Sequence, residues 1–145
     1  MANVNEILAT KGSKVHCIGP DATVLQAAGV MNQHKIGALL VMEGERIAGM
    51  FTERDVLQRV VAEHRDPTET LVNEVMTVEV ACCTPFTKIA EARTAMRERK
   101  IRHLPVLNDE GHLLGLISIG DLNAYEANSQ EQTIFLLQEY LYGRT

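Results

Sequence analysis

Tryptophan is absent from this chain of 145 residues, and phenylalanine and tyrosine together contribute only six residues. Aromatic platforms on which the bases of a single strand could stack are therefore scarce. The net charge of −5 argues against general binding to nucleic-acid phosphates. No run of about 18 apolar residues occurs, so no membrane-spanning helix is expected. The first residues lack the basic-then-apolar build of a secretory signal, and we expect a cytoplasmic protein.

Metal-binding and disulfide patterns are also missing. The three cysteines, Cys17, Cys82 and Cys83, form no CxxC pair, and the five histidines show no HxH or HExxH spacing. An odd number of cysteines, two of them adjacent, suits reduced and half-buried strand residues better than a set of disulfide bonds. We expect no metal site, and a redox role for Cys82 and Cys83 stays open.

What the chain does contain is an internal duplication. The segment VNEIL at 4–8 returns as VNEVM at 72–76, and two prolines, 65 residues apart, each precede an amphipathic stretch. One extra residue in the second turn then moves the offset to 66. The matched landmarks are Pro20 and Pro85, Ala27 and Ala92, Met31 and Met96, Ile36 and Ile101, Val41 and Val106, Gly49 and Gly115, and Asp55 and Asp121.

Each copy predicts the same mixed architecture, a short helical turn followed by the order β-α-β-β-α, in the α/β (α+β) class. The first copy predicts a brief strand near 15–17, a helix over 23–34, strands over 37–42 and 46–51, and a second helix with Val56, Leu57, Val60 and Val61 on one face. The second copy predicts a brief strand near 78–82, a helix over 87–99, and strands over 103–107 and 112–118. Each returning strand carries a glycine where backbone or ligand can approach closely.

These elements predict four segments. The first copy occupies 1–64, a polar linker follows at 65–71, and the second copy occupies 72–126. Residues 127–145 predict a C-terminal helix with an apolar stripe, which suits a cover over a core or a contact between subunits.

A hydroxyl and a carboxylate follow the returning strand in both copies, as TERD at 52–55 and SIGD at 118–121. This spacing is that of a capping box, in which the hydroxyl and the acid each satisfy a backbone N–H at the start of a helix. The same geometry suits a ligand, because a helix start offers free N–H groups and a carboxylate accepts both hydrogens of a ribose diol. The two uses are compatible, and the pattern alone does not choose between them.

Positive charge gathers in one window of the second copy. Residues 88–103 hold six basic residues against two glutamates, a net charge of +4 within a chain of −5. Arg102 and His103 stand where a loop enters a buried strand, whereas the first copy has Gly37 and Ala38 at those positions. If each copy helps to form a cleft, one cleft is expected to hold phosphate strongly and its counterpart weakly. The alternative is that Arg102 is a cation on the surface, and that His103 is buried with its hydrogen bonds made inside the protein.

The doubled pattern P…A…M…I…(G/R)(A/H)L(L/P)V…G…(T/S)xxD resembles tandem cystathionine-beta-synthase repeats, the CBS pair or Bateman module, over roughly residues 4–125. A short pair of this kind is similar to stand-alone bacterial CBS-pair regulatory proteins. The resemblance implies two halves packed by a pseudo-twofold axis, two clefts between them, and disc-shaped homodimers. It also implies binding of an adenosyl ligand: AMP, ADP, ATP or NAD(H), with S-adenosylmethionine less favoured.

Site residues follow from the resemblance by position. Asp55 and Asp121 would hold ribose hydroxyls, while Thr52 and Ser118 would contact sugar or phosphate. One expected cleft combines the first hydroxyl and acid with residues of the second copy: Thr52, Arg54, Asp55, Val78, Ile101, Arg102 and His103. The other combines Ser118 and Asp121 with Ile36, Gly37 and Ala38. Because Leu40 replaces the proline found as Pro105, and a KGS segment at 11–13 interrupts the match, the Thr52–Asp55 cleft is favoured for phosphate-bearing ligands.

Three functions remain open at this point. A ligand-sensing regulatory module would change its packing on binding an adenine nucleotide and so signal to a downstream protein partner. An interaction or scaffold protein would carry vestigial clefts and act through a homodimer. An enzyme is not expected, because no Ser or Cys has a spaced His partner and no catalytic cofactor is indicated.

Overall fold

The computed structural model describes residues 2–127; the predicted C-terminal helix at 127–145 lies almost wholly outside them. The chain divides into two compact units that do not follow the order of the repeats. Lys14–Cys82 with Asp109–Leu113 form the first, here the β1–β3 unit. Residues 2–13 join Cys83–Asn108 and residues 114–127 in the second, the β4–β5 unit. Within the part of the chain that the structure describes, no helix is long and apolar enough to cross a membrane.

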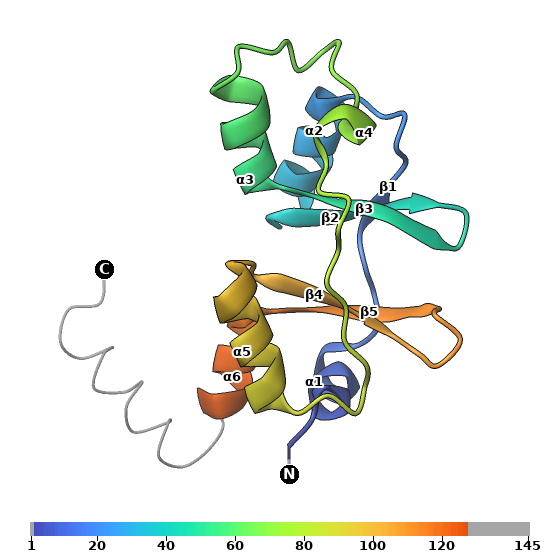
Figure 1. The fold of residues 1–145 in the computed structure, drawn as a ribbon, viewed down its shortest axis with the longest axis vertical. Coiled ribbons are helices and arrows are strands. Elements are labelled where there is room, and N and C mark those ends of the chain that lie inside the picture. The colour runs from blue at the N-terminus through green and yellow to red at the C-terminus, as the bar shows by residue number, and fades with distance from the viewer. Residues whose placement is uncertain (1, 128–145) are drawn as a thin grey trace, which may run out of the picture. The chain divides into compact units, whose positions relative to one another are not determined.

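The β1–β3 unit is a three-stranded sheet with helices packed on it (Figure 1). Strand β1 runs parallel to β2, which pairs antiparallel with β3. Its elements are β1 (Cys17–Ile18), α2 (Val24–His34), β2 (Ala38–Glu43), β3 (Arg46–Thr52), α3 (Glu53–Asp55), the π-helix η1 (Val56–Val61) and α4 (Val72–Val75). The apolar faces of α2, β2, β3, η1 and α4 meet in one buried core: Val24, Ala27, Met31, Leu39, Val41, Phe51, Val60, Val72 and Val75. Removing such side chains from water stabilises the fold by roughly 1.5–3 kcal/mol each.

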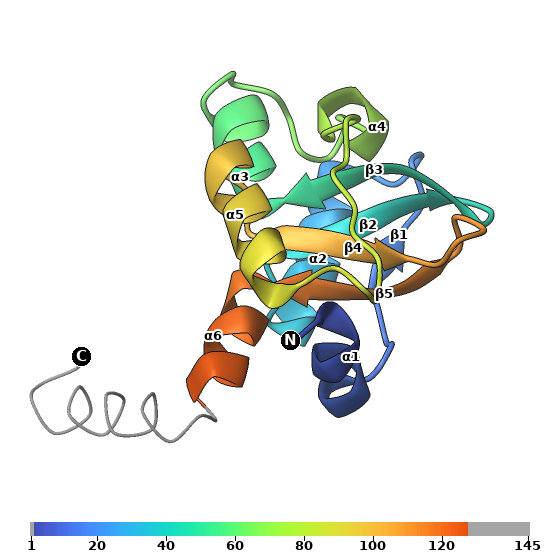
Figure 2. The same cartoon turned by 60° about the horizontal axis from the view of Figure 1, so that its bottom comes forward.

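The β4–β5 unit repeats the plan with a two-stranded sheet. Figure 2 shows α1, α5 and α6 gathered around the β4–β5 hairpin. Its elements are α1 (Val4–Lys11), α5 (Ile89–Arg99), β4 (His103–Leu107), β5 (Leu113–Ser118) and α6 (Ile119–Ala127). The duplication extends to the helix ends, because α2 stops at Lys35 and α5 at Lys100, both with left-handed backbone (φ 57° and 56°).

The short leading helices are exchanged between the copies. Helix α1 opens the first copy in sequence, yet Val4 N donates to Thr87 O at 2.9 Å and Asn5 N donates to Pro85 O at 2.9 Å. Helix α4 opens the second copy, yet Val72 N donates to Ala22 O at 2.8 Å in the first. Each unit is therefore completed by the helix that precedes the other copy.

The strand predicted near 78–82 is wrong. Only a single parallel bridge forms there, between Cys83 and Val106, whereas the first copy has a two-residue ladder. In the first copy Leu40 N donates to His16 O at 3.2 Å. Its counterpart Pro105 has no N–H, so the second copy lacks the donor for that bond and the ladder stops.

The apolar face predicted for the helix that follows β3 is also corrected. Val60 is buried in the core, but Leu57 and Val61 are 62% and 61% exposed. The cause is the winding of η1, where Ala62 N bonds Leu57 O at 2.9 Å, five residues back. Such π-winding changes the angle between successive side chains, and a stripe spaced for an α-helix splits into a buried and an exposed part.

Candidate functional site

The first hydroxyl–carboxylate pair lies where β3 passes into α3. Asp55 Oδ2 accepts from Thr52 N at 3.0 Å, and Asp55 N donates to Thr52 Oγ1 at 3.4 Å. The capping box predicted for TERD is therefore present, and it fixes the carboxylate at the end of the strand. Asp55 is only 5% exposed, one of two buried polar residues among those described. Because a buried carboxylate is removed from water, its hydrogen bonds and ion pairs are needed to offset the cost of burying its charge.

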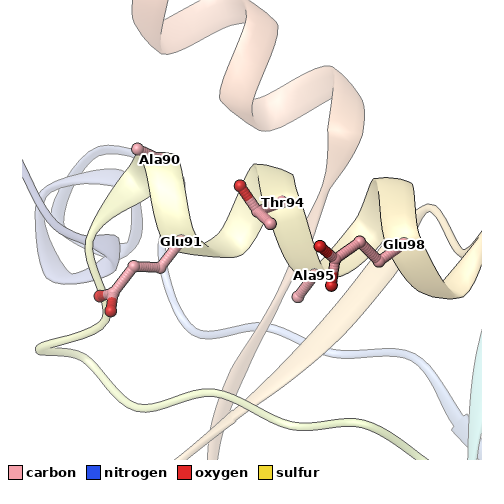
Figure 3. Close-up of a pocket in the computed structure, with 5 residues that line it drawn as sticks. All are labelled: Ala90, Glu91, Thr94, Ala95 and Glu98. Carbon is pink, nitrogen blue, oxygen red and sulfur yellow. The ribbon is translucent and has the colours of Figure 1, made fainter.

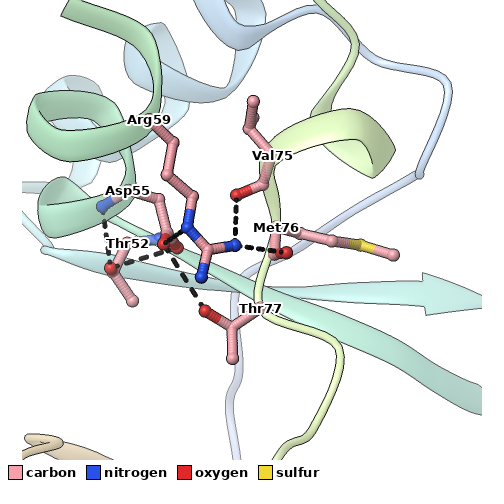
Figure 4. Close-up of polar contacts among 6 residues, drawn as sticks. All are labelled: Thr52, Asp55, Arg59, Val75, Met76 and Thr77. Atoms are coloured by element: carbon pink, nitrogen blue, oxygen red, sulfur yellow. Dashed lines mark hydrogen bonds and ion pairs between the residues drawn. The ribbon is translucent and has the colours of Figure 1, made fainter. Parts of the chain in front are cut away.

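Two further groups approach the same carboxylate (Figure 4). Thr77 Oγ1 lies 3.4 Å from Asp55 Oδ1, and Arg59 Nε lies 3.6 Å from it. The Arg59 guanidinium also donates to the carbonyls of Val75 at 3.2 Å and Met76 at 3.0 Å. Arg59 thus connects the acid to the end of α4. Sequence reasoning missed Arg59 and Thr77, although the i,i+4 spacing of Arg59 from Asp55 was a visible signal.

The second hydroxyl–carboxylate pair repeats the cap where β5 passes into α6. Asp121 Oδ2 accepts from Ser118 N at 2.8 Å, and Asp121 N donates to Ser118 Oγ at 3.1 Å. Here the further partner is a lysine: Lys11 Nζ lies 2.6 Å from Asp121 Oδ2 and 2.6 Å from Leu116 O. Lys11 is the last residue of α1, and Gly12, at φ 92°, ends that helix. The KGS segment therefore supplies a partner for the second acid.

The glycines of the returning strands allow this close packing. A Cβ on Gly49 would lie 2.7 Å from Thr77 O and 2.7 Å from Met76 Sδ, and a Cβ on Gly115 would lie 2.8 Å from Leu8 Cδ2. Residues of α1, and residues just after α4, thus occupy the space over the two glycines. The backbone approach expected at these glycines is confirmed at Gly49, where it is made by Thr77 O, whereas Gly115 is approached by a side chain.

The residues entering β2 lie beside the first pair. Ala38 is the register partner of Thr52, and Glu53 N donates to Gly37 O at 3.0 Å. A Cβ on Gly37 would lie 2.7 Å from Glu53 Oε1, so a larger residue could not stand there without moving that glutamate. Ile36 is half-buried against the core of the same unit. Within one unit, these loop-to-strand residues accompany the hydroxyl and acid of their own copy.

The second copy has the same local arrangement. Ile119 N donates to Arg102 O at 2.9 Å, which brings the entrance of β4 next to Ser118. Ile101 and His103 are half-buried, and the Arg102 side chain is exposed. The structure thus joins Ile36, Gly37 and Ala38 to Thr52, and Ile101, Arg102 and His103 to Ser118. The grouping of residues across the two copies stays a prediction.

Two other predicted residues lie at the edge of the first pair. Arg54 is exposed on α3, and Val78 is 68% exposed just after Thr77. An apolar side chain so exposed next to the chain that contacts Asp55 is available to a ligand or to another protein surface.

A shallow hollow of about 370 Å³ lies elsewhere, on the outer face of α5 (Figure 3). Its lining residues within 2–127 come from that one helix: Ala90, Glu91, Thr94, Ala95 and Glu98. These described residues bring two carboxylates and no cation, a lining that does not suit a phosphate. It contains none of the predicted site residues.

Among residues 2–127 no group of three His, Cys, Asp or Glu side chains is arranged to hold a metal ion. Loss of hydration raises the pKa of the Cys82 thiol above its ordinary value, and the same cause raises the pKa of Cys17. A raised pKa leaves less of the nucleophilic thiolate at neutral pH.

The chain is similar to several known proteins with this arrangement. The CBS domain profile matches residues 4–62 and 72–128. The mitochondrial CBS domain-containing protein CBSX3 of Arabidopsis thaliana is 33% identical over 97% of this chain and 72% of its own. A solved protein with CBS domains from Burkholderia ambifaria is 39% identical, with a TM-score of 0.84 over 89% of this chain and 97% of its own.

A more distant likeness is to the CBS domain protein PAE2072 of Pyrobaculum aerophilum, whose structure is a complex with AMP. It is 22% identical, with a TM-score of 0.75 over 94% of this chain and 98% of its own, so it supports the fold alone. The two matched segments, the duplicated caps and the matching structures together identify the family: this chain belongs to the CBS domain family and carries two CBS repeats.

Proposed function

We propose that this protein is a regulatory module that binds an adenine nucleotide through the Thr52–Asp55 pair and signals by a conformational change. The observation that carries the proposal is the Asp55 carboxylate, held at a strand end by backbone contacts while its other partners lie at 3.3–3.6 Å. Hydroxyl donors of a ribose diol bond carboxylates at shorter distances, 2.5–2.7 Å, and would replace these weak contacts favourably. AMP, ADP, ATP and NAD(H) all carry that diol.

Basic side chains would bind the phosphate of the nucleotide. Arg102 and His103 are the favoured candidates from the second copy, and Arg54, next to Asp55 in sequence, is a further one. The family supports a regulatory, nucleotide-binding role in general, and the AMP complex of PAE2072 is an example from a structural neighbour. No catalytic step is proposed.

The signal would pass through Arg59. A diol on Asp55 competes with Arg59 for the carboxylate, and Arg59 also binds the carbonyls of Val75 and Met76 at the end of α4. Ligand binding would therefore change how tightly α4 is held to its unit. A downstream protein could read that change, since a ligand shifts an equilibrium by its differential affinity for two states.

Calorimetric titration with AMP, ATP, NADH and S-adenosylmethionine tests the proposal. At least one nucleotide should bind, and Asp55→Asn should weaken its affinity at least tenfold, about 1.4 kcal/mol. Asparagine keeps an oxygen for the cap, so this variant separates ligand contact from helix capping. Asp21→Asn removes an equal charge at an exposed turn and serves as the control. Absence of binding by all four compounds would overturn the proposal.

A homodimer is proposed as the working assembly. Leu57 and Val61 expose apolar side chains on the same helix segment, a surface that favours burial against another copy. Light scattering should give twice the chain mass, and Leu57→Glu with Val61→Glu should give a folded monomer with the circular dichroism of wild type and a lower melting temperature, because the stabilisation by the partner copy is lost. A monomeric wild-type protein would contradict this assembly. The protein would then act as a single chain.

A further inference from the structure

The acid of the second copy already holds a cation. Lys11 Nζ contacts Asp121 Oδ2 at 2.6 Å and Leu116 O at 2.6 Å, distances typical of short charge-assisted hydrogen bonds. The Lys11 and Asp121 side chains are 34% and 23% exposed, so the pair is partly shielded from water and from salt. A ribose diol that bonds to Asp121 Oδ2 would have to compete with Lys11 for that oxygen.

The first acid presents a different case. Its corresponding partner is the Thr77 hydroxyl at 3.4 Å, a neutral group that can rotate away or accept a hydrogen bond from the ligand. Arg59 Nε approaches at 3.6 Å, a longer contact than the 2.6 Å of Lys11, on a side chain that is 49% exposed. Exchange of partners is therefore easy at Asp55 and hard at Asp121.

The lysine reaches the second acid for a structural reason. Leu8 of α1 packs where a Cβ on Gly115 would stand, and Lys11 lies three residues further along the same helix. In the first copy Met76 packs over Gly49, and Thr77 follows directly. Both contacts come from the chain that follows the residue packed over the glycine, but they reach different oxygens, Asp55 Oδ1 and Asp121 Oδ2, and they differ in chemistry: a hydroxyl in the first copy, an ammonium in the second.

We infer that Lys11 is a specificity-determining residue that closes the second copy's carboxylate to the ribose diol, so that each chain binds one nucleotide, at Asp55. The inference rests on the proposed function, since it concerns the same type of site. It makes the two copies unequal: one binds ligand, and the other keeps its acid as an internal ion pair that fastens α1 to its unit.

Calorimetry with AMP tests the inference on the full-length chain. Wild type should bind one AMP per chain, and Lys11→Met, which keeps most of the apolar stem, should bind two. The double variant Lys11→Met with Asp55→Asn should again bind one. Lys14→Met is the matched control, because Lys14 is an exposed lysine three residues away, and it should bind one AMP like wild type.

The outcomes separate the two proposals. One AMP bound by both wild type and Lys11→Met, or two bound by wild type, overturns the role of Lys11 and leaves the proposed function standing. Weaker binding by Lys11→Met also overturns it, because a lysine that helps hold phosphate is not a block. No binding by any variant overturns the proposed function instead. Binding by Lys11→Met alone supports the block and removes Asp55 as the wild-type site.

A measurement on wild type covers the case in which Lys11→Met does not fold. Titration of AMP into ¹⁵N-labelled protein should shift the amide resonances of Thr52 and Asp55 and leave those of Ser118 and Asp121 in place. Shifts of similar size and similar midpoint at both pairs would overturn the inference.

Discussion

The two CBS copies share their capping boxes and differ in what comes next to them. Thr52 with Asp55 and Ser118 with Asp121 form the same pair of backbone–side-chain bonds. The further partners are Thr77 and Arg59 in the first copy and Lys11 in the second. Both copies thus retain the cap, whereas these further partners give each acid its own chemistry. Duplicated sites are best compared through these added partners.

The strand glycines provide the largest expected difference between the copies. Gly49→Ala would place a Cβ 2.7 Å from a backbone oxygen, which cannot move without shifting the chain, and we expect a loss of about 2–3 kcal/mol in the free energy of unfolding. Gly115→Ala meets only the tip of the Leu8 side chain at 2.8 Å, which can rotate, and we expect about 1 kcal/mol or less. Urea denaturation of both variants makes the comparison. Equal losses would show that the two contacts are equally rigid.

Exchange of the leading helices predicts a crossed pattern of destabilisation. Val4 and Val72 are both fully buried, and truncation of either to alanine should cost about 2 kcal/mol. Val72→Ala should speed amide hydrogen exchange in β1–β3, and Val4→Ala should speed it in β4 and β5. If each variant loosens the unit of its own sequence repeat instead, the exchange described for α1 and α4 is wrong.

The smallest expected effect is a pH dependence confined to the β1–β3 unit. Loss of hydration, with the nearby His34 and Lys14 charges, lowers the pKa of His16, whose ring stacks on His34 at 4.0 Å. The folded state therefore takes up its proton less readily than the unfolded chain, whose histidine has a pKa near 6.5. The contribution of neutral His16 to the free energy of unfolding is therefore fully present above pH 6.5. It is lost as the pH falls from 6.5 through the lowered pKa of the folded state.

Melting temperatures at pH 7.5 and 5.5 should reveal that loss, and His16→Gln should reduce it. The second copy has Ala81 and Arg99 at the corresponding positions, so exchange rates in β4 and β5 should not share the effect. An unchanged pH profile in His16→Gln would remove His16 as the cause.

Much of the fold followed from the sequence because the signals were local and doubled. The helices over 24–34 and 89–99 and the four long strands agree with their predicted ranges to within about two residues. The failures came from interactions that no periodicity records. A missing N–H at Pro105 shortened one ladder, and π-winding after Asp55 turned Leu57 outward.

At the site, the TERD and SIGD spacing correctly predicted both caps, since a capping box is a local motif. Lys11 could not be predicted as a partner of Asp121, because the two lie 110 residues apart and meet only through the packing of α1 on β5. Thr77 likewise came within reach of Asp55 only through the position of α4, whereas Arg59, four residues from Asp55, was a local partner. Long-range partners of this kind require a tertiary structure.

The crossed placement of α1 and α4 also bears on synthesis and on dissection. A polypeptide emerging from the ribosome cannot complete the β1–β3 unit until α4 has been made, and α1 must wait for β4 and β5 before it has a surface to cover. A gene fragment cut between the repeats, near residue 65, would leave α1 without its binding surface and Val24 without the chain that covers it. Halves of this protein are better sought by co-expression than by simple truncation.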